Sequence, residues 1–382
     1  MQGALRASDA PASSPGPAST TTPAGVGASG PARLLVVGAG AIGGVLAASL
    51  LASGHRTDVL TTNANIAGAL HRDGFRVTGK SRVRHARPCG IYASAGETEG
   101  PYDYVLLATQ PPQVEEAAAQ IAPLVDRDGR VVCFQNGLCE VRVARAVGRE
   151  RVLGAVVAWG ASMPEPGLYD RTSSGGLTLG RLDGPPDARV EALSRLLGDA
   201  FGVRTTSNLL GARWSKLAIN CAISTLGTIG GARLGQLITH RFVRRLALEL
   251  MSECVYVARR EGVRLEKVAG TVDLDWLALT PADERTSGSL LLGAKHAVLL
   301  AAGVRYRRLR SSMLAAIERG RPPAVDFLNG EVVDRAERYD IAAPISRAAR
   351  DCVWQIARGK CAASLTTLES LYRDTRARRE GA

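Results

Sequence analysis

Three polar residues recur at helical spacing within an otherwise apolar stretch of the sequence, WSKLAINCAISTLGTIG (214–230). Lys216, Asn220 and Ser224 follow one another at intervals of four residues, so a helix would place all three on one face. A lysine among apolar neighbours loses hydration, which lowers its pKa and makes it a better proton donor to a carbonyl oxygen. The pattern predicts a general acid at Lys216; the solvated face of a surface helix is the alternative.

Lysine is rare in this chain, because arginine fills nearly all of the 48 basic positions and only five residues are lysines. Arginine does not lose its proton at accessible pH, so a remaining lysine can be kept for proton transfer. A second lysine among apolar residues is Lys295, in LLLGAKHAVLL. For Lys295 we expect a surface position, with the stem on apolar surface and the ammonium group in water.

A glycine pattern near the start of the chain could hold a phosphate group. Gly38, Gly40 and Gly43 form G-x-G-x-x-G between an apolar run and a helix-like segment. The first glycine permits a tight turn, the second lets a pyrophosphate approach the backbone, and the third lets the helix pack against the strand. The N–H groups that open the helix, including those of Ala41 and Ile42, would face the phosphates. The pattern predicts a dinucleotide site.

The choice between NAD and NADP is normally made at the end of the second strand, by an acidic residue for NAD or an arginine for NADP. This sequence has Thr61, Thr62 and Asn63 there, and Arg72 is the nearest arginine that follows them. Neither signature is present. These residues therefore do not decide the cofactor. Because their hydroxyl and amide groups could bind a phosphate weakly, we predict NADP and leave NAD open.

The first half of the sequence alternates strand-like and helix-like segments, which predicts a Rossmann-type doubly wound parallel sheet. The expected strands are 33–37, 57–62, 104–109, 130–135, 152–159 and 176–184, and the expected helices are 43–54 and 113–124. After residue 205 strand-like runs almost disappear. Helical periodicity covers 209–227, 241–261, 287–302, 324–339 and 346–358.

The fold class is therefore α/β, an N-terminal Rossmann domain (32–205) followed by an all-helical domain (206–376). A cleft between the two is the expected ligand site. The ends, 1–31 and 377–382, are expected to be disordered, because their composition buries too little apolar surface to offset the ordering entropy.

Composition excludes several classes of function. The formal net charge of +12 does not indicate nucleic-acid binding, because aromatic residues make up 4% of the chain and no basic run is interleaved with them. No apolar run is long enough to span a membrane. Histidine is rare and lacks ligand spacing, so no metal site is expected. The seven cysteines form no pattern and suit a reducing compartment, which predicts a cytoplasmic protein.

Taken together, five segments resemble the ketopantoate reductase (2-dehydropantoate 2-reductase) family over residues 33–358. In chain order they are GAGAIGG (38–44), FQNGL (134–138), WSKLAINCAIS (214–224), SSML (311–314) and RPPAVDFLNG (321–330). The resemblance implies a reductase that transfers hydride from NAD(P)H to a small 2-oxo acid or related ketone, and a homodimer. It also implies roles for individual residues.

By this resemblance Lys216 donates a proton to the ketone oxygen as hydride arrives. Asn136 lies near the nicotinamide ribose and the substrate, although it could also be only a turn residue. Asn220 and Ser312 match substrate-binding positions, and capping a helix is the alternative for Ser312. Gly160 aligns with a backbone contact to the cofactor.

Five positions depart from the family pattern. Ala324 replaces a glutamate, Ser224 replaces an asparagine on the substrate side, Leu234 replaces another asparagine, Gln110 replaces a lysine, and Thr62 replaces a phosphate-binding arginine. Losing polar partners of a substrate hydroxyl changes specificity strongly. A less polar 2-oxo acid, or another small ketone, therefore fits better than ketopantoate. A catalytically impaired NAD(P)-binding sensor or regulatory protein is the alternative.

Overall fold

The computed structural model describes residues 30–267, 273–285 and 289–380. The chain divides into Met1–Pro31 and a compact unit, Ala32–Ala382. The tail expected at 1–31 lies outside the described residues except for its last two. At the other end, α15 (Leu365–Glu380) continues through 377–380, so the expected disorder was wrong for these four residues. Burial of Leu368 and Leu371 anchors the helix, which then continues into its polar end.

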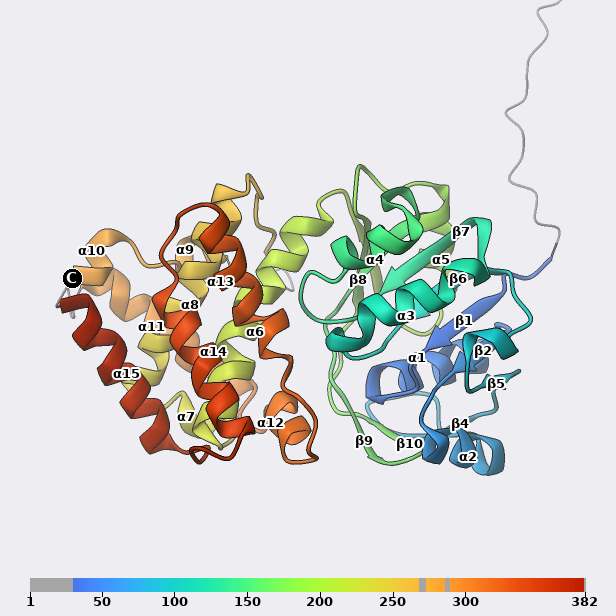
Figure 1. The fold of residues 1–382 in the computed structure, drawn as a ribbon, viewed down its shortest axis with the longest axis horizontal. Helices are drawn as coiled ribbons and strands as arrows, with labels where there is room; N and C mark the ends of the chain where they lie inside the picture. The colour runs from blue at the N-terminus through green and yellow to red at the C-terminus, as the bar shows by residue number, and fades with distance from the viewer. Residues whose placement is uncertain (1–29, 268–272, 286–288, 381–382) are drawn as a thin grey trace, which may run out of the picture. The chain divides into compact units, whose positions relative to one another are not determined.

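An eight-stranded sheet in the order β12-β11-β8-β7-β6-β1-β2-β5 forms the centre of the first half (Figure 1). All neighbouring strands are parallel except β8 and β11, which are antiparallel. This confirms the predicted fold class, with one antiparallel pair added. The strands are β1 (Leu34–Val37), β2 (Thr57–Leu60), β5 (Ile91–Tyr92), β6 (Tyr102–Leu107), β7 (Val125–Cys133), β8 (Val152–Val157), β11 (Leu177–Arg181) and β12 (Val203–Thr206).

The central strands are apolar throughout because both faces of the sheet are covered. In β1, Leu34 and Val36 belong to one core, which contains residues of α1 (Ala41–Ala52) and α5 (Ala188–Gly198). The alternate residues of β1 belong to a second core with α3 (Val114–Ile121) and α4 (Glu140–Val147). Helices therefore cover both faces, as a doubly wound sheet requires.

A second, four-stranded sheet in the order β4-β3-β10-β9 was not predicted. Its strands are only two to five residues long, and β3 pairs with a strand about ninety residues away. Tyr169 of β10 packs against α1 at Gly44, and its hydroxyl donates to the carbonyl of Ala39 at 3.0 Å. The strands are β3 (Phe75–Gly79), β4 (His85–Ala86), β9 (Ala161–Glu165) and β10 (Leu168–Arg171); α2 (Ala64–Asp73) precedes them.

The second half is helical within the described ranges, and α6 packs against α8, α12, α14 and α15. The expected single helix over 324–339 was wrong. A 3-10 helix (Ala324–Phe327) and α13 are separated at Leu328, whose side chain turns into the core. The helices are α6 (Leu209–Gly230), α7 (Leu234–Leu237), α8 (Arg241–Arg260), α9 (Leu274–Leu277), α10 (Pro281–Arg285), α11 (Leu290–Arg305), α12 (Ser312–Ile317), α13 (Asn329–Arg338) and α14 (Pro344–Ala357).

The expected surface position of Lys295 was wrong. Its side chain is 1% exposed, and Nζ donates to Oδ2 of Asp283 and to the carbonyl of Ala278, both at 2.7 Å. The segment that carries α9 and α10 supplies this carboxylate, which compensates the buried charge. No helix within the described ranges is both long and apolar enough to cross a bilayer.

Candidate active site

The carboxyl ends of β1, β6, β7 and β8 lie at one edge of the large sheet, because these strands are parallel neighbours. The chain order reverses at β1, which lies between β2 and β6. Ligands of such sheets bind at the carboxyl ends of the strands beside this reversal. The residues that leave the strands here are Gly38 after β1, Thr109 after β6 and Gln135 after β7.

The glycine turn has the geometry that a dinucleotide phosphate requires. Gly38 has a φ of +95°, which disfavours a side chain. A Cβ on Gly43 would lie 1.9 Å from the carbonyl oxygen of Gly38, whereas a Cβ on Gly40 would meet nothing within 4 Å. The first bond of α1 runs from the N–H of Gly44 to Gly40 at 2.7 Å, so the N–H groups of 41–43 precede it. The turn therefore fits a pyrophosphate.

Lys216 reaches the same edge from α6. Its Nζ donates to the carbonyl oxygen of Val157, the last residue of β8, at 2.8 Å. Desolvation of the half-buried side chain lowers the lysine pKa to about 7; nearby Arg213 lowers it further and Glu140 opposes the shift. Within the described part of the chain Lys216 forms no ion pair with a carboxylate. An ammonium group in this position can donate a proton near neutral pH.

The other two members of the predicted stripe are half-buried beside Lys216. Asn220 and Ser224 follow Lys216 along α6. Leu217, after Lys216, and Cys221, after Asn220, are buried. The polar face of α6 is therefore narrow and partly covered, unlike a fully solvated helix face. This agrees with the spacing of the sequence pattern and places the three side chains along one line of α6.

Ser311, not Ser312, caps α12, so the capping alternative for Ser312 was wrong. The Ser311 hydroxyl accepts from the N–H of Leu314 at 3.3 Å and donates to the carbonyl of Ser224 at 2.9 Å. Ser312 is the exposed first residue of α12. The contact through Ser311 places the start of α12 beside the Ser224 end of the stripe, where Ser312 stays open to a ligand.

The FQNGL turn follows β7. Asn136 is exposed, and Gly137 has a φ of +89° and packs so closely on Phe327 that a Cβ would lie 2.6 Å from its carbonyl oxygen. Gln135 is buried; its Nε2 donates to Oγ1 of Thr109 at 3.2 Å, and its Oε1 has no hydrogen-bond partner in the part of the chain that the structure describes. This turn therefore joins the ends of β6 and β7 to the 3-10 helix that begins at Ala324.

The predicted backbone contact of Gly160 with the cofactor gains no support. Its N–H donates to Oγ of Ser173 at 2.8 Å, and its carbonyl accepts from the N–H of Thr172 at 2.9 Å. A Cβ on Gly160 would lie 2.7 Å from Oγ1 of Thr172. Packing within the protein accounts for this glycine, and its N–H is not free for a phosphate.

The residues after β2 offer little to a cofactor phosphate. Thr62 is exposed, but Oδ1 of Asn63 caps α2 by accepting from the N–H groups of Asn65 and Ile66, both at 3.1 Å. Arg72 is in the last turn of α2, and a guanidinium nitrogen lies 3.5 Å from a Cβ built on Gly68. Its side chain thus lies along the middle of α2 rather than beside Thr62.

The altered family positions also have defined surroundings. Ala324 is half-buried at the start of the 3-10 helix, and Gln110 is exposed after β6. Leu234 is 7% exposed, and its N–H donates to the carbonyl of Leu309 at 2.9 Å. A carboxylate is thus absent at residue 324 and an amide at residue 234.

Within the described ranges, no three His, Cys, Asp or Glu side chains come together as metal ligands do.

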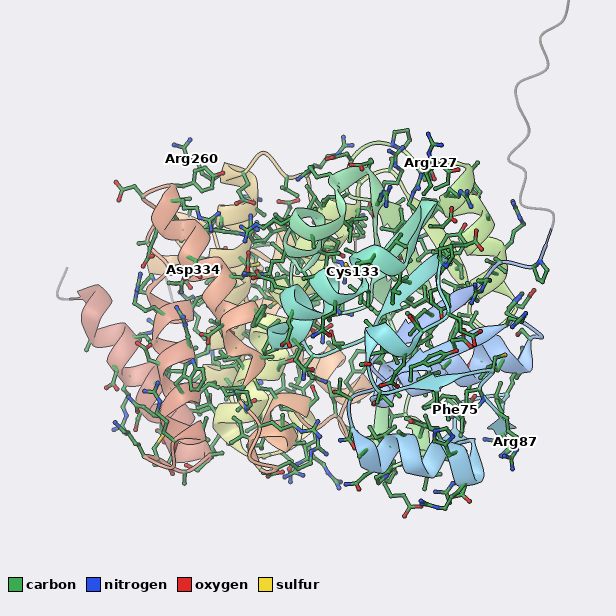
Figure 2. All side chains as sticks on the ribbon, turned by 45° about the vertical axis from the view of Figure 1, so that its right-hand side comes forward. Phe75, Arg87, Arg127, Cys133, Arg260 and Asp334 are labelled. Atoms are coloured by element: carbon green, nitrogen blue, oxygen red, sulfur yellow. The ribbon has the colours of Figure 1, made fainter. Side chains whose placement is uncertain are left out.

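The sequence reading missed two charged residues near the site, Arg213 and Glu140. Arg213 is 1% exposed and donates from Nε to Oε1 of Glu140 at 2.5 Å. Its Nη1 donates to the carbonyl of Gln135 at 2.9 Å and its Nη2 to that of Cys133, labelled in Figure 2, at 2.7 Å. A charge three residues before Lys216 in an apolar helix was a visible signal, but its partner is 73 residues away.

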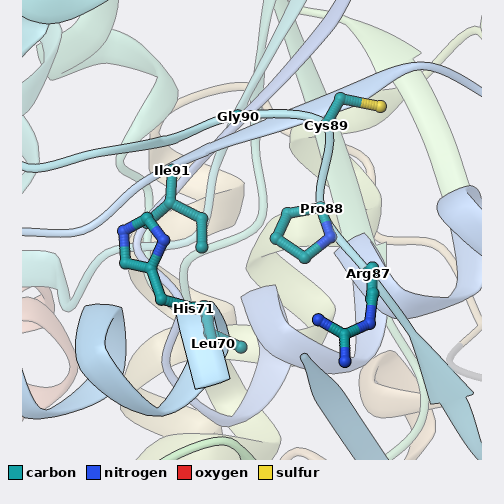
Figure 3. Close-up of a pocket in the computed structure, with 7 residues that line it drawn as sticks. All are labelled: Leu70, His71, Arg87, Pro88, Cys89, Gly90 and Ile91. Atoms are coloured by element: carbon teal, nitrogen blue, oxygen red, sulfur yellow. The ribbon is translucent and has the colours of Figure 1, made fainter. Parts of the chain in front are cut away.

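Two surface hollows lie outside this site. The first has a volume of about 160 Å³ and is lined by Leu70, His71 and 87–91, near the amino ends of β2 and β5 (Figure 3). The second, of about 530 Å³, follows α2 from Ala64 to Asp73 and includes Arg76. Neither hollow includes a predicted catalytic or substrate-binding residue. The candidate active site is therefore defined by the residues at the strand ends and on α6.

All five segments singled out in the sequence are connected in space. The glycine turn adjoins Thr109, whose hydroxyl accepts from Gln135, and Arg213 links Gln135 to α6. The remaining links are Gly137 with Phe327, Asn329 Nδ2 with the carbonyl of Cys221 at 3.4 Å, and Ser311 with the carbonyl of Ser224. A dinucleotide turn and a lysine at one sheet edge define the class of nicotinamide-dependent oxidoreductases.

The comparisons with known proteins give the family. Residues 34–184 match the model of ketopantoate reductase PanE/ApbA, and residues 208–358 match the model of its C-terminal part. The two matches cover most of the chain. It belongs to the ketopantoate reductase PanE/ApbA family.

Individual relatives are distant. A 2-dehydropantoate 2-reductase of Halobacterium salinarum is 28% identical over 334 residues, covering 84% of this chain and 97% of that protein. A PanE/ApbA family ketopantoate reductase from Ralstonia eutropha has a TM-score of 0.72 at 23% identity, over 86% and 99% of the two chains. D-Mandelate dehydrogenase with NADH and anilino(oxo)acetate has a TM-score of 0.71 at 19% identity, over 89% and 99%. These structures establish a shared fold.

Proposed function

We propose that this protein is an NAD(P)H-dependent reductase of a small 2-oxo acid or related ketone, with Lys216 as the proton donor. The observation that carries this proposal is the hydrogen bond from Lys216 to Val157. It brings to the carboxyl edge of the sheet an ammonium group that has no carboxylate partner among the described residues. The glycine turn after β1 lies at the same edge. A bound nicotinamide would supply the hydride.

The residues of the chain divide the remaining work. Protonated Lys216 donates to the carbonyl oxygen of the substrate, and its lowered pKa makes the proton transfer easier near neutral pH. Asn136 follows β7, Asn220 and Ser224 follow Lys216 along α6, and Ser312 opens α12. We assign these four polar side chains to substrate binding, since they come from α6 and from the two segments bonded to it, the FQNGL turn through Arg213 and α12 through Ser224.

The substrate we propose is less polar than ketopantoate. Ala324 offers a methyl group and Leu234 a buried isobutyl group, where the family pattern has a carboxylate and an amide. Without this carboxylate and this amide, the site lacks two hydrogen-bond partners for a substrate hydroxyl, so it should not favour a hydroxylated substrate. The fold shared with D-mandelate dehydrogenase, whose structure contains anilino(oxo)acetate, supports testing aromatic and branched 2-oxo acids first.

NADP is the cofactor we propose, with NAD as the second candidate. Binding of each reduced cofactor is measured by titration, and turnover is then measured by cofactor absorbance across a panel of aliphatic, aromatic and hydroxylated 2-oxo acids. Reduction of at least one apolar 2-oxo acid in preference to ketopantoate is expected. Binding without turnover across the whole panel would instead favour the NAD(P)-binding sensor, to which the missing carboxylate at Ala324 points.

We also propose a homodimer formed through the helical half. Among the described side chains of α11, the exposed large ones are apolar: Leu290, Leu291, Val298, Leu300 and Val304. A face of this kind is typical of an interface. Sedimentation should show a dimer that Val298→Glu dissociates; a monomeric wild-type protein would contradict the assignment.

The domain limits at 205 and 206 and the cytoplasmic location stay predictions.

A further inference from the structure

A buried pair of opposite charges lies next to Lys216 and has no part in the proton transfer itself. Arg213 is on α6, one turn before Lys216, and Glu140 is the first residue of α4. Both side chains are at most 2% exposed. A buried pair of this kind is seldom worth keeping for stability alone, because removing two charges from water costs about as much as their attraction returns.

The contacts of Arg213 connect three parts of the site. One guanidinium edge binds Glu140, whose Oε1 lies 2.5 Å from a Cβ built on Gly154 of β8. The remaining N–H groups donate to the carbonyls of Cys133 and Gln135, which end β7 and begin the FQNGL turn. Arg213 thus links α4, β7 and α6 at the point where α6 meets the sheet.

We propose that Arg213 and Glu140 act as a positioning pair, which holds the Lys216 turn of α6 against the carboxyl end of β7 and balances the charge that Lys216 experiences. The pair works through Lys216 and does not touch the reacting atoms. The consequence for turnover rests on the proposed reductase function, whereas the effect on Lys216 itself does not.

The two charges act on Lys216 in opposite directions. Arg213 disfavours a second positive charge nearby and lowers the lysine pKa, whereas Glu140 raises it. In the described part of the chain no other charged group from the elements packed around Lys216 contributes, and β8 offers the neutral carbonyl of Val157. Removing either member should therefore shift the protonation of Lys216, each in its own direction.

The test compares Arg213→Gln with Glu140→Gln. In Arg213→Gln the pKa of Lys216 should rise, because the repelling charge is lost and Glu140 is left uncompensated. In Glu140→Gln it should fall below the wild-type value of about 7, because Arg213 is left alone. A shift of about one pH unit or more is expected for each variant. The measurement is the pH dependence of Lys216 acetylation by trace acetic anhydride, read from the Lys216 peptide by mass spectrometry.

The chain supplies its own standards for this measurement, because Lys80, Lys267 and Lys360 are exposed lysines outside the site. Arginine side chains stay protonated and do not consume the reagent. The matched control is Arg245→Gln. Arg245 is also buried and donates to Glu249 and to the carbonyl of Asp283, each at 2.8 Å, and neither of these bonds involves the Lys216 turn. It should lose stability and leave the Lys216 titration unchanged.

Opposite shifts in the two variants, with no shift in Arg245→Gln, support the positioning pair. Shifts in the same direction, or unaltered titration in both variants, overturn it. If Arg213→Gln does not fold, Glu140→Gln and the charge-conserving Arg213→Lys decide: the first must lower the pKa, and the second must keep it near the wild-type value. Acetylation needs no substrate, so a wild-type protein that reduces no 2-oxo acid would remove the proposed function and leave this test intact.

Discussion

Lys216 on α6 and Lys295 on α11 lie in similar sequence surroundings but in different electrostatic ones. Lys295 is fully buried and bound to a carboxylate, Asp283, whereas Lys216 is half-buried and bound to a backbone carbonyl. Burial alone would raise the pKa of Asp283, but hydrogen bonds from Lys295 and Thr280 bring it to about 2. In Lys295 the buried carboxylate compensates the charge, whereas Lys216 has a neutral acceptor at the carboxyl edge of the sheet, which suits the proton transfer that we propose for it.

The largest effect expected from this comparison is on turnover. Replacing Lys216 with alanine should reduce kcat/KM for the best 2-oxo acid by about 10²–10⁴-fold, the usual loss for a general acid. The affinity for reduced cofactor, measured by titration, should stay near that of the wild type, because the glycine turn is untouched. Unchanged turnover would remove Lys216 from the mechanism.

The next largest effect concerns stability and falls on the other lysine. Lys295→Met leaves Asp283 buried without its counter-ion, and the free energy of unfolding should drop by about 3–5 kcal/mol in urea denaturation. Lys216→Met is the matched control, because among the described residues Lys216 has no carboxylate partner that the substitution would leave unpaired. If both variants lost the same free energy of unfolding, the buried Asp283 partner of Lys295 would make no difference to stability.

Proton donation by Lys216 predicts a pH profile. Its pKa is lowered to about 7, so the ammonium form is depleted above that pH. For reduction, kcat/KM should be level below pH 7 and fall about tenfold per unit above it, since this parameter reports the free enzyme. Lys295→Met should keep the same profile, and a profile that rises with pH would mean that the neutral amine is the active form.

The smallest effect is the pH dependence of stability at Lys216. Because the folded pKa lies below the ordinary 10.5, the unfolded chain binds more protons between about pH 7 and 10.5. Over this window the wild type should therefore gain stability with pH. Lys216→Met should be more stable than the wild type by about 1 kcal/mol near pH 6. That advantage should shrink as the pH rises; an advantage that grows with pH would have the wrong sign.

Features that depend on neighbouring residues could be predicted from the sequence. The glycine spacing before α1, the apolar strands β1 and β6, and the line of Lys216, Asn220 and Ser224 are set by strand and helix periodicity over a few residues. The strand order came only from the structure, and the expectation that Lys216 lies beside the cofactor came only from the family resemblance. One feature that depends only on neighbouring residues was nevertheless predicted wrongly. The cap of α12 is Ser311, whereas Ser312 was the cap considered from the sequence.

What the sequence by itself determined is a dinucleotide-binding half followed by a helical half, together with the helix face that carries Lys216, the proton donor we propose. Tertiary structure alone decided which charges pair. Lys295 meets Asp283, Arg213 meets Glu140 across 73 residues, and Tyr169 of an unpredicted sheet supports the glycine turn. The physical reason is range: backbone periodicity acts within one or two turns, whereas the partner of a buried charge is whichever group the packed chain brings within hydrogen-bonding distance.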